Sequence, residues 1–231
     1  MSELFELPPH PALPISGEDA QFPVHRIFCV GRNYEAHARE MGFSPQRDAP
    51  IYFTKAPSTI CQSGTAIPYP PGTQNCHYEM ELVVALGKAG FRISADKAMS
   101  LVFGYACGLD LTRRDLQNAA RDKGHPWDTG KDFENAAVIG PITRAEKFGA
   151  PGPHRIVLTQ NGEGRQDARL SDMIWSVPEL IADLSCLYHL GPGDLIYTGT
   201  PAGVGPITPG DDLVGSIDGL EDVRLHIASA E

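Results

Sequence analysis

The sequence has few cysteines, no long apolar run and a deficit of positive charge. Its five cysteines are odd in number, widely spaced and without a C-x-x-C pair, so neither a disulfide framework nor a clustered zinc site is indicated. No apolar run approaches the roughly 20 residues that a helix needs to cross a bilayer, and the first residues lack the basic and apolar regions of a targeting signal. We therefore expect reduced thiols, a cytoplasmic location and no membrane partner.

The balance of charged residues further restricts the classes of binding partner. With 19 Lys and Arg against 29 Asp and Glu, the net charge of −10 disfavours binding to nucleic acid, and a small molecule is the expected partner. The 24 glycines and 20 prolines favour many short strands joined by turns. A length of 231 residues fits one domain, although length alone also permits two. We expect an extended N-terminal arm over residues 1–22 and a single domain over residues 23–231.

Residues 77–86 alternate polar and apolar side chains and then become continuously apolar. This pattern predicts a strand on which His77, Glu79 and Glu81 share one face, because side chains two residues apart point the same way. Converging carboxylates raise each other's pKa unless a cation lies between them or water screens them. An exposed face in water is the alternative, but the apolar run over residues 82–86 indicates burial, and buried carboxylates need partners. A hard divalent cation is the natural partner.

Asp110 follows a second strand-like segment, residues 101–109, and adds a third carboxylate. Three carboxylates without clustered cysteine or histidine suit one Mg²⁺ or Mn²⁺ ion in an octahedral site and leave about three positions open. A 2-oxo acid can fill two of these positions through its carboxylate and keto oxygens. Basic residues that match an anionic substrate stand in the segments that carry these ligands: Arg32, Lys55, Arg114 and Lys131.

His37 and Glu40 lie three residues apart in a short predicted helix, with Asn33 as its N-cap and Gly42 as its stop. At this spacing the carboxylate can orient and polarise the imidazole, as a general base requires. The alternative is a solvated pair without a catalytic role. The polar segment 33–50, flanked by glycines, also suits a lid that closes over bound substrate.

Two loops carry further polar groups. Lys131 follows Gly130 in the irregular segment 125–133, where glycine permits a close approach of the backbone, and an exposed loop lysine is the alternative. The glycine-rich segment 198–206 follows a strand, but Pro206 opposes an immediate helix and no lysine follows the glycines, which argues against a nucleotide-binding loop. Its threonine hydroxyls and N–H groups can instead receive a carboxylate.

Other segments predict the frame around these residues. Thr112 is expected to cap a helix that ends at Gly124. Ser176 is expected to cap a second helix, which packs through an apolar stripe that ends at Leu187. The dipeptide Asn161-Gly162 predicts a tight hairpin. A second hairpin is expected from Asp212 to Ile227, with its turn at Asp218-Gly219.

Taken together, the motifs resemble the fumarylacetoacetate hydrolase family in order and spacing from about residue 24 to residue 227. Within the family the sequence most resembles the acylpyruvate hydrolase branch, especially bacterial fumarylpyruvate hydrolases. The resemblance implies an α+β, β-rich mixed-sheet fold with a few short helices, and a homodimer. The motifs that carry it are Val30-Gly31-Arg32-Asn33-Tyr34 with His37 and Glu40, His77-Tyr78-Glu79-Met80-Glu81-Leu82, Gly108-Leu109-Asp110-Leu111-Thr112 with Arg114 and Gln117, Lys131, and Thr198-Gly199-Thr200-Pro201.

The resemblance also implies roles for individual residues. A single Mg²⁺ or Mn²⁺ would bind the carboxylates, and His37 oriented by Glu40 would activate a water molecule that attacks the C4 carbonyl of a 2,4-dioxo acid. Lys131, helped by Gln117, would stabilise the oxyanion. The implied metal ligands are Glu79, Glu81 and Asp110, and the candidates for holding substrate carboxylates are Arg32, Lys55, Arg114 and Thr200.

The implied reaction is hydrolysis of an acylpyruvate, with fumarylpyruvate giving fumarate and pyruvate in gentisate-type aromatic catabolism. Within the family, an oxaloacetate decarboxylase or an oxo-acid tautomerase is the alternative, since these reactions share the enolate chemistry. The pair of His37 and Glu40 favours hydrolysis, because only hydrolysis needs an activated water molecule. A metal-binding protein without catalytic activity is the alternative from another class.

Overall fold

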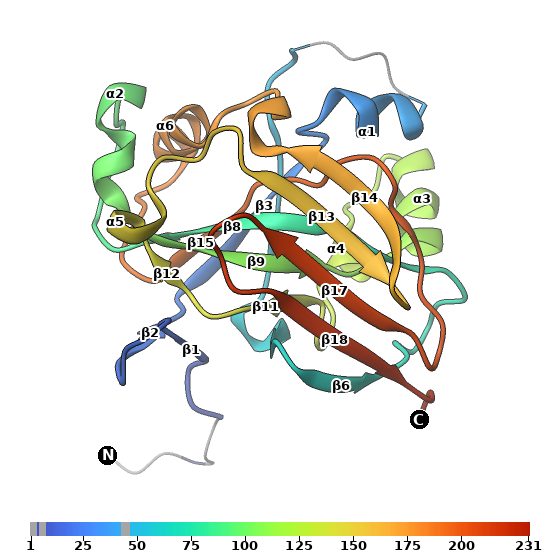
Figure 1. Ribbon diagram of the computed structural model, residues 1–231. Helices are drawn as coiled ribbons and strands as arrows, with labels where there is room; N and C mark the ends of the chain where they lie inside the picture. Colours follow the sequence, from blue (N-terminus) through green and yellow to red (C-terminus); the bar gives the residue numbers. More distant parts are fainter. Residues whose placement is uncertain (1–3, 5–7, 43–46) are drawn as a thin grey trace.

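The computed structural model describes residue 4, residues 8–42 and residues 47–231, and a mixed eight-stranded sheet runs through its centre (Figure 1). The two longest strands of this sheet, β8 and β9, are antiparallel neighbours in its middle. The strand order is β4 (Ile51–Lys55), β3 (Arg26–Gly31), β15 (Asp194–Tyr197), β8 (Met80–Leu86), β9 (Val102–Asp110), β11 (Ala137–Ile139) and β5 (Ile60–Gln62), and β12 (Thr143–Arg144) pairs with β9.

A five-stranded sheet packs over one face of the central sheet, with β13 above β8 and β17 above β9. Two smaller sheets complete the β structure of the described residues, and the β-rich mixed-sheet fold expected from the sequence is confirmed. The five-stranded sheet has the order β14 (Glu163–Arg169), β13 (Arg155–Gln160), β17 (Asp212–Ile217), β18 (Val223–Ala228) and β6 (Thr65–Pro68), the three-stranded sheet β10 (Thr112–Arg113), β7 (Cys76–Tyr78) and β16 (Gly205–Pro206), and the two-stranded sheet β1 (Ala12–Pro14) and β2 (Gln21–Pro23).

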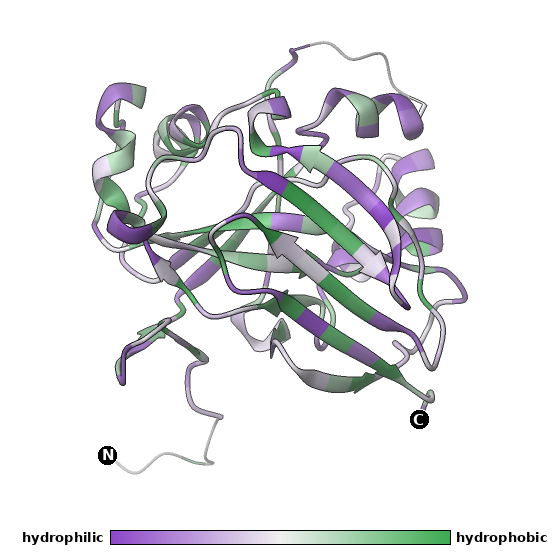
Figure 2. Cartoon of the chain, in the orientation of Figure 1, coloured by the Kyte–Doolittle hydropathy of each residue, from purple (hydrophilic) through white to green (hydrophobic). Residues whose placement is uncertain are grey.

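Short helices lie around the sheets, and none in the described part of the chain is long and apolar enough to cross a membrane (Figure 1). Figure 2 shows α3 mostly hydrophilic, as its sequence predicts for a helix at the surface. The helices are α1 (Glu35–Glu40), α2 (Ala95–Ala98), α3 (Arg114–Asp122), α4 (Asp128–Lys131), α5 (Ala145–Phe148) and α6 (Val177–Leu187), with 3₁₀ turns at Pro57–Thr59, Met99–Leu101 and Leu170–Asp172.

The alternation of β8 divides the core into two clusters. Met80, Leu82 and Val84 pack into the larger cluster between the two large sheets, whereas Val83 and Ala85 join the smaller cluster on the opposite face. The smaller cluster also contains apolar side chains from β1 and β2, so this pair of strands is packed onto the domain. A strand buried on both faces explains why its sequence becomes continuously apolar.

Several local predictions are confirmed. Asn161 and Gly162 have φ values of 56° and 81° and turn the hairpin from β13 to β14. Ser176 and Glu179 form the capping box that begins α6. A second hairpin, β17 to β18, turns near Gly219, whose φ is 85°.

Other local predictions are wrong, because tertiary partners outcompete local ones. Asn33 does not cap α1; its amide donates to the carbonyl oxygens of Trp175 and Thr198 and so joins two distant loops. Thr112 does not cap α3 but belongs to β10, where its hydroxyl accepts a hydrogen bond from Lys131.

Three further corrections concern boundaries. The predicted strand over residues 77–86 is interrupted at Glu79, between β7 and β8. The irregular segment 125–133 contains the short helix α4. Leu187, expected in the apolar stripe of α6, is 61% exposed because it lies at the last turn, beyond the buried Leu184.

Candidate active site

Three carboxylates meet at one end of the β8–β9 pair. The N–H of Asp110 donates to the carbonyl oxygen of Glu79 at 2.9 Å, so these two residues lie opposite each other where the ladder ends. Glu81 lies opposite Gly108, and a β-carbon there would come within 2.5 Å of Val83. One oxygen from each of Glu79, Glu81 and Asp110 lies within 4.8 Å of the others, and all three residues are buried. The alternative of an exposed acidic face is therefore wrong.

Two of the carboxylates already face cations. Lys55 and Lys131 contact opposite oxygens of Asp110 at 2.8 and 2.7 Å, and Lys131 also contacts Glu79 at 2.9 Å. Arg114 pairs with the other oxygen of Glu79. Burial favours the neutral form of Glu79, but Lys131 and Arg114 outweigh it and hold the pKa of this carboxyl below its usual range.

Glu81 is in a different position. Among the described residues it has no cationic side chain within ion-pair distance, and its carboxylate accepts a hydrogen bond from the N–H of Gly199 at 2.7 Å. Burial, and then the charges of Asp110 and Glu79, raise the pKa of Glu81 well above its ordinary value. A divalent cation would relieve this buried charge, and an all-oxygen donor set matches the preference of Mg²⁺ and Mn²⁺. The residues therefore fit the expected metal.

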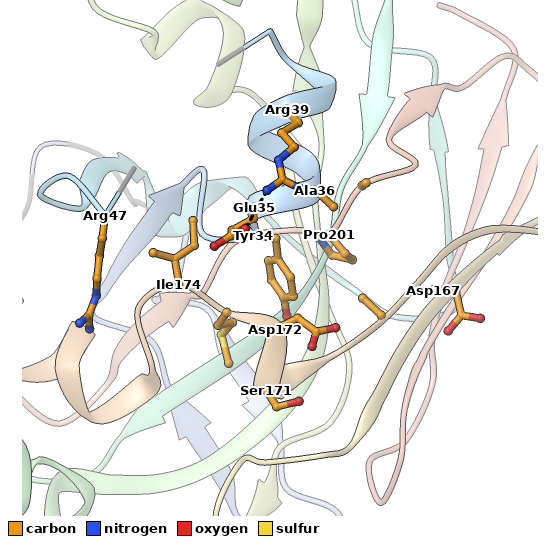
Figure 3. Close-up of a pocket in the computed structure, with 13 residues that line it drawn as sticks. Tyr34, Glu35, Ala36, Arg39, Arg47, Asp167, Ser171, Asp172, Ile174 and Pro201 are labelled. Carbon is orange, nitrogen blue, oxygen red and sulfur yellow. Dashed lines mark hydrogen bonds and ion pairs between the residues drawn. The ribbon is translucent and has the colours of Figure 1, made fainter. Parts of the chain in front are cut away.

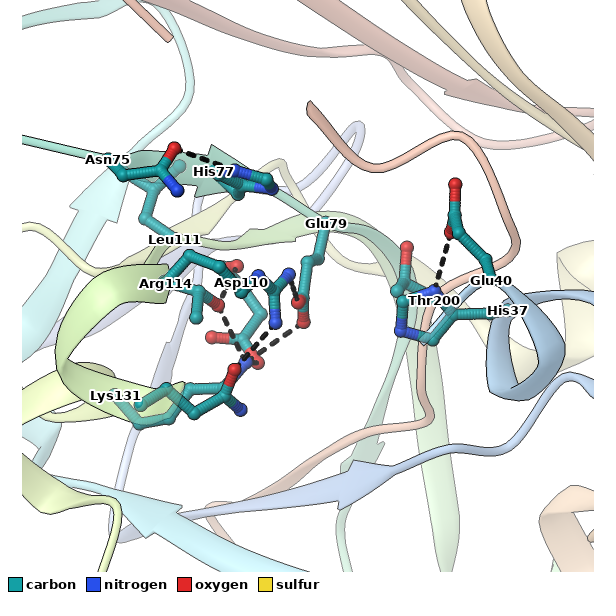
Figure 4. Close-up of polar contacts among 12 residues, drawn as sticks. His37, Glu40, Asn75, His77, Glu79, Asp110, Leu111, Arg114, Lys131 and Thr200 are labelled. Carbon is teal, nitrogen blue, oxygen red and sulfur yellow. Dashed lines mark hydrogen bonds and ion pairs between the residues drawn. The ribbon is translucent and has the colours of Figure 1, made fainter. Parts of the chain in front are cut away.

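His37 and Glu40 form a hydrogen-bonded pair on α1, to one side of the carboxylates (Figure 4). Nδ1 of His37 lies 3.0 Å from one carboxylate oxygen of Glu40, and the other oxygen accepts a hydrogen bond from the N–H of Gly203 at 3.0 Å. The side chain of His37 is only 7% exposed, so the solvated pair that the sequence left open is not what the structure contains. Glu40 is thus fixed from two sides and can hold the imidazole in one orientation.

A single cavity joins the two groups. His37 lines it together with Glu79 and Glu81, which places a candidate base beside the candidate metal centre. The predicted site residues that also line this cavity are Arg32, Arg114, Gln117, Lys131 and Thr200.

The basic residues divide between the cavity and its rear wall. Lys131 is buried rather than exposed, and its ammonium group also donates to the hydroxyl of Thr112 at 2.6 Å. Gly130 lets it approach, because a β-carbon at that position would lie 2.9 Å from the backbone nitrogen of Gln117. Lys55 lies behind Asp110 and not among the cavity-lining residues, a position that suits charge neutralisation rather than contact with a substrate.

Arg114 and Gln117 act as a pair on α3. Nη1 of Arg114 donates to the side-chain oxygen of Gln117 at 2.6 Å while Nη2 binds Glu79. His77 was expected on the same strand face as Glu79 and Glu81, but it is not part of the carboxylate cluster. Its Nε2 lies 2.9 Å from the side-chain oxygen of Asn75 (Figure 4).

Two residues near the site were missed by the sequence analysis. Arg121 lines the cavity, and its spacing of seven residues from Arg114 on one helix is a signal that could have found it. Burial, followed by the charge of Arg121, lowers the pKa of Arg32 in the same cavity. Gln166, on β14, binds the loop that carries Thr200, and no local pattern marks it.

A larger depression of about 850 Å³ lies beside α1 (Figure 3). Pro201 and Ala202 form part of its wall, so it adjoins the loop that carries Thr200. None of the three clustered carboxylates lines it. The smaller cavity is therefore the candidate active site. The predicted lid, segment 33–50, includes residues 43–46, which lie outside the described residues, and it stays a prediction.

The family model for the C-terminal domain of fumarylacetoacetate hydrolase matches residues 26–228. The chain belongs to the fumarylacetoacetate hydrolase family. This match spans nearly all the strands and every predicted site residue, so the resemblance inferred from the motifs is confirmed.

Relatives of this chain are named for two different activities. A fumarylpyruvate hydrolase from Ralstonia sp is 52% identical over 181 residues, which cover 78% of this chain and 94% of that protein. An oxaloacetate tautomerase from Mus musculus is 40% identical over 205 residues, covering 89% of this chain and 92% of that protein. A crystal structure of fumarylpyruvate hydrolase from Pseudomonas aeruginosa, with Mn²⁺ and pyruvate, superposes with a TM-score of 0.95 at 45% identity and covers 99% of this chain and 100% of that one.

Proposed function

We propose that this family member is a metal-dependent hydrolase that cleaves fumarylpyruvate into fumarate and pyruvate. The observation that carries the proposal is one cavity lined by the buried carboxylates of Glu79 and Glu81 and by His37, whose imidazole is hydrogen-bonded to Glu40. The fumarylpyruvate hydrolase from Ralstonia sp and the Pseudomonas aeruginosa enzyme with Mn²⁺ and pyruvate support the choice of substrate and cation.

Glu79, Glu81 and Asp110 would hold one Mg²⁺ or Mn²⁺ ion, which when bound supplies Lewis-acid polarisation to the oxygens of the 2-oxo acid. His37 removes a proton from water. The hydrogen bond from Nδ1 to Glu40 makes Nε2 the basic nitrogen, and the carboxylate stabilises the imidazolium that forms.

The hydroxide formed in this way attacks the C4 carbonyl carbon of the acylpyruvate. Lys131, with Gln117, donates to the oxyanion that develops there. The C3–C4 bond then breaks with its electron pair on C3, so fumarate leaves as the acid product and pyruvate forms as its enolate. The enolate takes up at C3 the proton that His37 removed from water. Arg32, Arg114 and Thr200 would bind the carboxylates of the substrate, since all three line the cavity.

Lys131 would also affect metal binding. Its ammonium group binds Glu79 and Asp110, which are the same carboxylates that would hold the metal. Ammonium and divalent cation compete for these oxygens, and metal binding would leave Lys131 available to the substrate.

Tautomerisation of oxaloacetate is the second candidate, and the mouse oxaloacetate tautomerase at 40% identity favours it. That reaction moves a proton within the substrate and needs no activated water. The pair of His37 and Glu40 is suited to water activation, so it favours hydrolysis.

Pyruvate release from fumarylpyruvate tests the proposal, measured by coupling to lactate dehydrogenase after removal of metal with EDTA and readdition of Mn²⁺. We expect activity with Mn²⁺ and loss of activity in EDTA. Activity that is indifferent to EDTA would refute metal dependence, and an enzyme that tautomerises oxaloacetate without releasing pyruvate from fumarylpyruvate would favour the second candidate.

We also propose a homodimer in the cytoplasm. The family resemblance supports the dimer, and the free state of all five cysteines, four of them buried, supports a reducing compartment. Light scattering of the purified chain tests the first point, and localisation in fractionated cells tests the second.

A further inference from the structure

Gln166 lies on β14 in the five-stranded sheet, outside the motifs of the active site, yet it is only 2% exposed and its amide is fully bonded. Its Nε2 donates to the hydroxyl oxygen of Thr200 at 2.8 Å and to the carbonyl oxygen of Pro201 at 2.7 Å. Its Oε1 accepts a hydrogen bond from the N–H of Met80 at 3.0 Å. One buried side chain therefore joins the loop after β15 to the start of β8.

The chemistry of these partners fixes the orientation of the amide. The Met80 N–H can only donate, so it must face the amide oxygen, and the Pro201 carbonyl can only accept, so it must face the NH₂ group. Thr200 therefore receives a hydrogen from Gln166. Because its oxygen is acting as an acceptor toward an NH₂ group, the proton of the Thr200 hydroxyl must point elsewhere.

Both ends of this connection lie at the active site. Thr200 lines the cavity together with Glu79 and Glu81. Met80 stands between those two glutamates in the sequence, and its N–H is the group that Gln166 holds. Gln166 thus sets the position of Thr200 relative to the strand that carries two of the three carboxylates.

We propose that Gln166 is a positioning residue that aims the Thr200 hydroxyl at the carboxylate of a bound 2-oxo acid. This inference rests on the proposed function, because that function supplies the anion that Thr200 binds. Gln166 does not touch the substrate itself. It acts by taking the acceptor side of the Thr200 oxygen, which leaves the O–H as a donor toward the cavity.

Gln166→Glu tests the idea with little change of shape. A glutamate still accepts from Met80, but it has no NH₂ group, so the Thr200 hydroxyl turns to donate to it and is lost to the substrate. Gln166→Met keeps the side-chain volume without a carboxylate and serves as the second variant if Gln166→Glu does not fold. Gln160→Met is the matched control, because Gln160 in the same sheet donates to the carbonyl of Pro206 in β16, just beyond that loop, and its hydrogen bonds do not include Thr200.

The measurement is the affinity of the Mn²⁺-loaded protein for pyruvate by calorimetry, which requires no turnover. We expect Gln166→Glu to weaken pyruvate binding about 10-fold, the value of one hydrogen bond to a charged group, with Mn²⁺ affinity within about 2-fold of wild type. In fumarylpyruvate hydrolysis the loss should fall on KM rather than kcat, because the contact removed is made equally in the ground state and the transition state. Gln160→Met should match wild type in pyruvate affinity.

A double variant isolates the link to Thr200. In the Thr200→Val background Gln166→Glu should weaken pyruvate binding no further, because the hydroxyl that it redirects is already gone. Pyruvate affinity unchanged in Gln166→Glu, an additive loss in the double variant, or a parallel fall in Mn²⁺ affinity would each overturn the proposal. If the wild-type protein binds pyruvate but does not hydrolyse fumarylpyruvate, the proposed function fails while the pyruvate affinities still decide the role of Gln166.

Discussion

The two halves of the active site are held by the fold in different ways. Glu81 and Asp110 stand on the two longest strands of the eight-stranded sheet, which are neighbours in its middle. Both residues are buried, and Asp110 forms ion pairs with Lys55 and Lys131. His37 and Glu40 stand on a six-residue helix, and the side chain of Glu40 is 34% exposed. Its described link to the rest of the site is one hydrogen bond from the N–H of Gly203.

This difference separates the residues that would bind the metal from the residues that would activate water. The carboxylate centre is part of the core, so changing it alters folding, metal binding and catalysis together. The pair of His37 and Glu40 lies at the edge of the core. Changing either residue should therefore alter catalysis while the metal centre keeps its geometry. The following variants test this separation.

Asp110→Asn should have the largest effect. It leaves the ammonium groups of Lys55 and Lys131 facing a neutral amide in a buried site, and breaking such a pair costs about 3–5 kcal/mol of folding free energy. Mn²⁺ binding and hydrolysis should both be lost, as measured by calorimetry and pyruvate release, with denaturant unfolding as the stability assay. Asp167→Asn, in an exposed pair with Arg155, is the control and should keep Mn²⁺ affinity. Retention of wild-type Mn²⁺ affinity in Asp110→Asn would show that Asp110 is not a ligand.

Lys131→Met should separate metal binding from catalysis in the opposite direction. Hydrolysis should fall about 10²- to 10³-fold, the usual effect of removing an oxyanion donor. Mn²⁺ affinity should rise about 10-fold, because a positive charge a few ångströms from the metal site is removed. The two quantities are measured on the same preparation by titration and by pyruvate release. Weaker Mn²⁺ binding would contradict the competition between Lys131 and the cation.

Gly203→Ala should have the smallest effect of the three variants, and it should act only on the pair of His37 and Glu40. Gly203 has a φ of 95°, and a β-carbon there would lie 2.1 Å from the carbonyl oxygen of Arg165, so the loop must shift. Its N–H would move away from Glu40, and we expect hydrolysis to fall about 10-fold, equivalent to about 1.4 kcal/mol, with Mn²⁺ affinity unchanged.

Gly162→Ala is the matched control for this variant. Gly162 has a similar φ of 81°, but a β-carbon there meets nothing within 4 Å, and the residue lies in the hairpin between β13 and β14. It should share the backbone strain without the loss of activity. Equal loss of activity in both variants would assign the effect to general destabilisation rather than to the contact with Glu40.

The parts of the site that the sequence predicted are those that strand periodicity makes visible. The alternation in residues 77–86 places Glu79 and Glu81 on one side, and the apolar segment before Asp110 delivers the third carboxylate at the end of β9. The pair of His37 and Glu40 is visible because residues three apart are neighbours on a helix. In each case the partners are close in sequence, or lie on strands that pair directly.

The parts that the sequence could not predict depend on partners far apart in the chain. Asparagine is a preferred N-cap residue, yet the amide of Asn33 donates to residues more than 140 positions away in the sequence. Gln166 lies in a hairpin whose polar sequence predicts an exposed strand. Its hydrogen bond to Thr200 forms only because β14 passes the loop that carries Thr200. Local capping preferences are worth about 1 kcal/mol, so buried tertiary hydrogen bonds of similar strength can override them.

The most direct test of the account is His37→Ala, assayed for Mn²⁺ affinity, fumarylpyruvate hydrolysis and oxaloacetate decarboxylation. Glu79, Glu81 and Asp110 are untouched, so Mn²⁺ affinity should stay within about 2-fold of wild type, and hydrolysis should fall about 10²- to 10⁴-fold, as for loss of a general base. Any oxaloacetate decarboxylation should decline much less, because it needs no activated water. If hydrolysis and decarboxylation fall equally while Mn²⁺ affinity is unchanged, water activation is not the separate task of His37 and the account is contradicted.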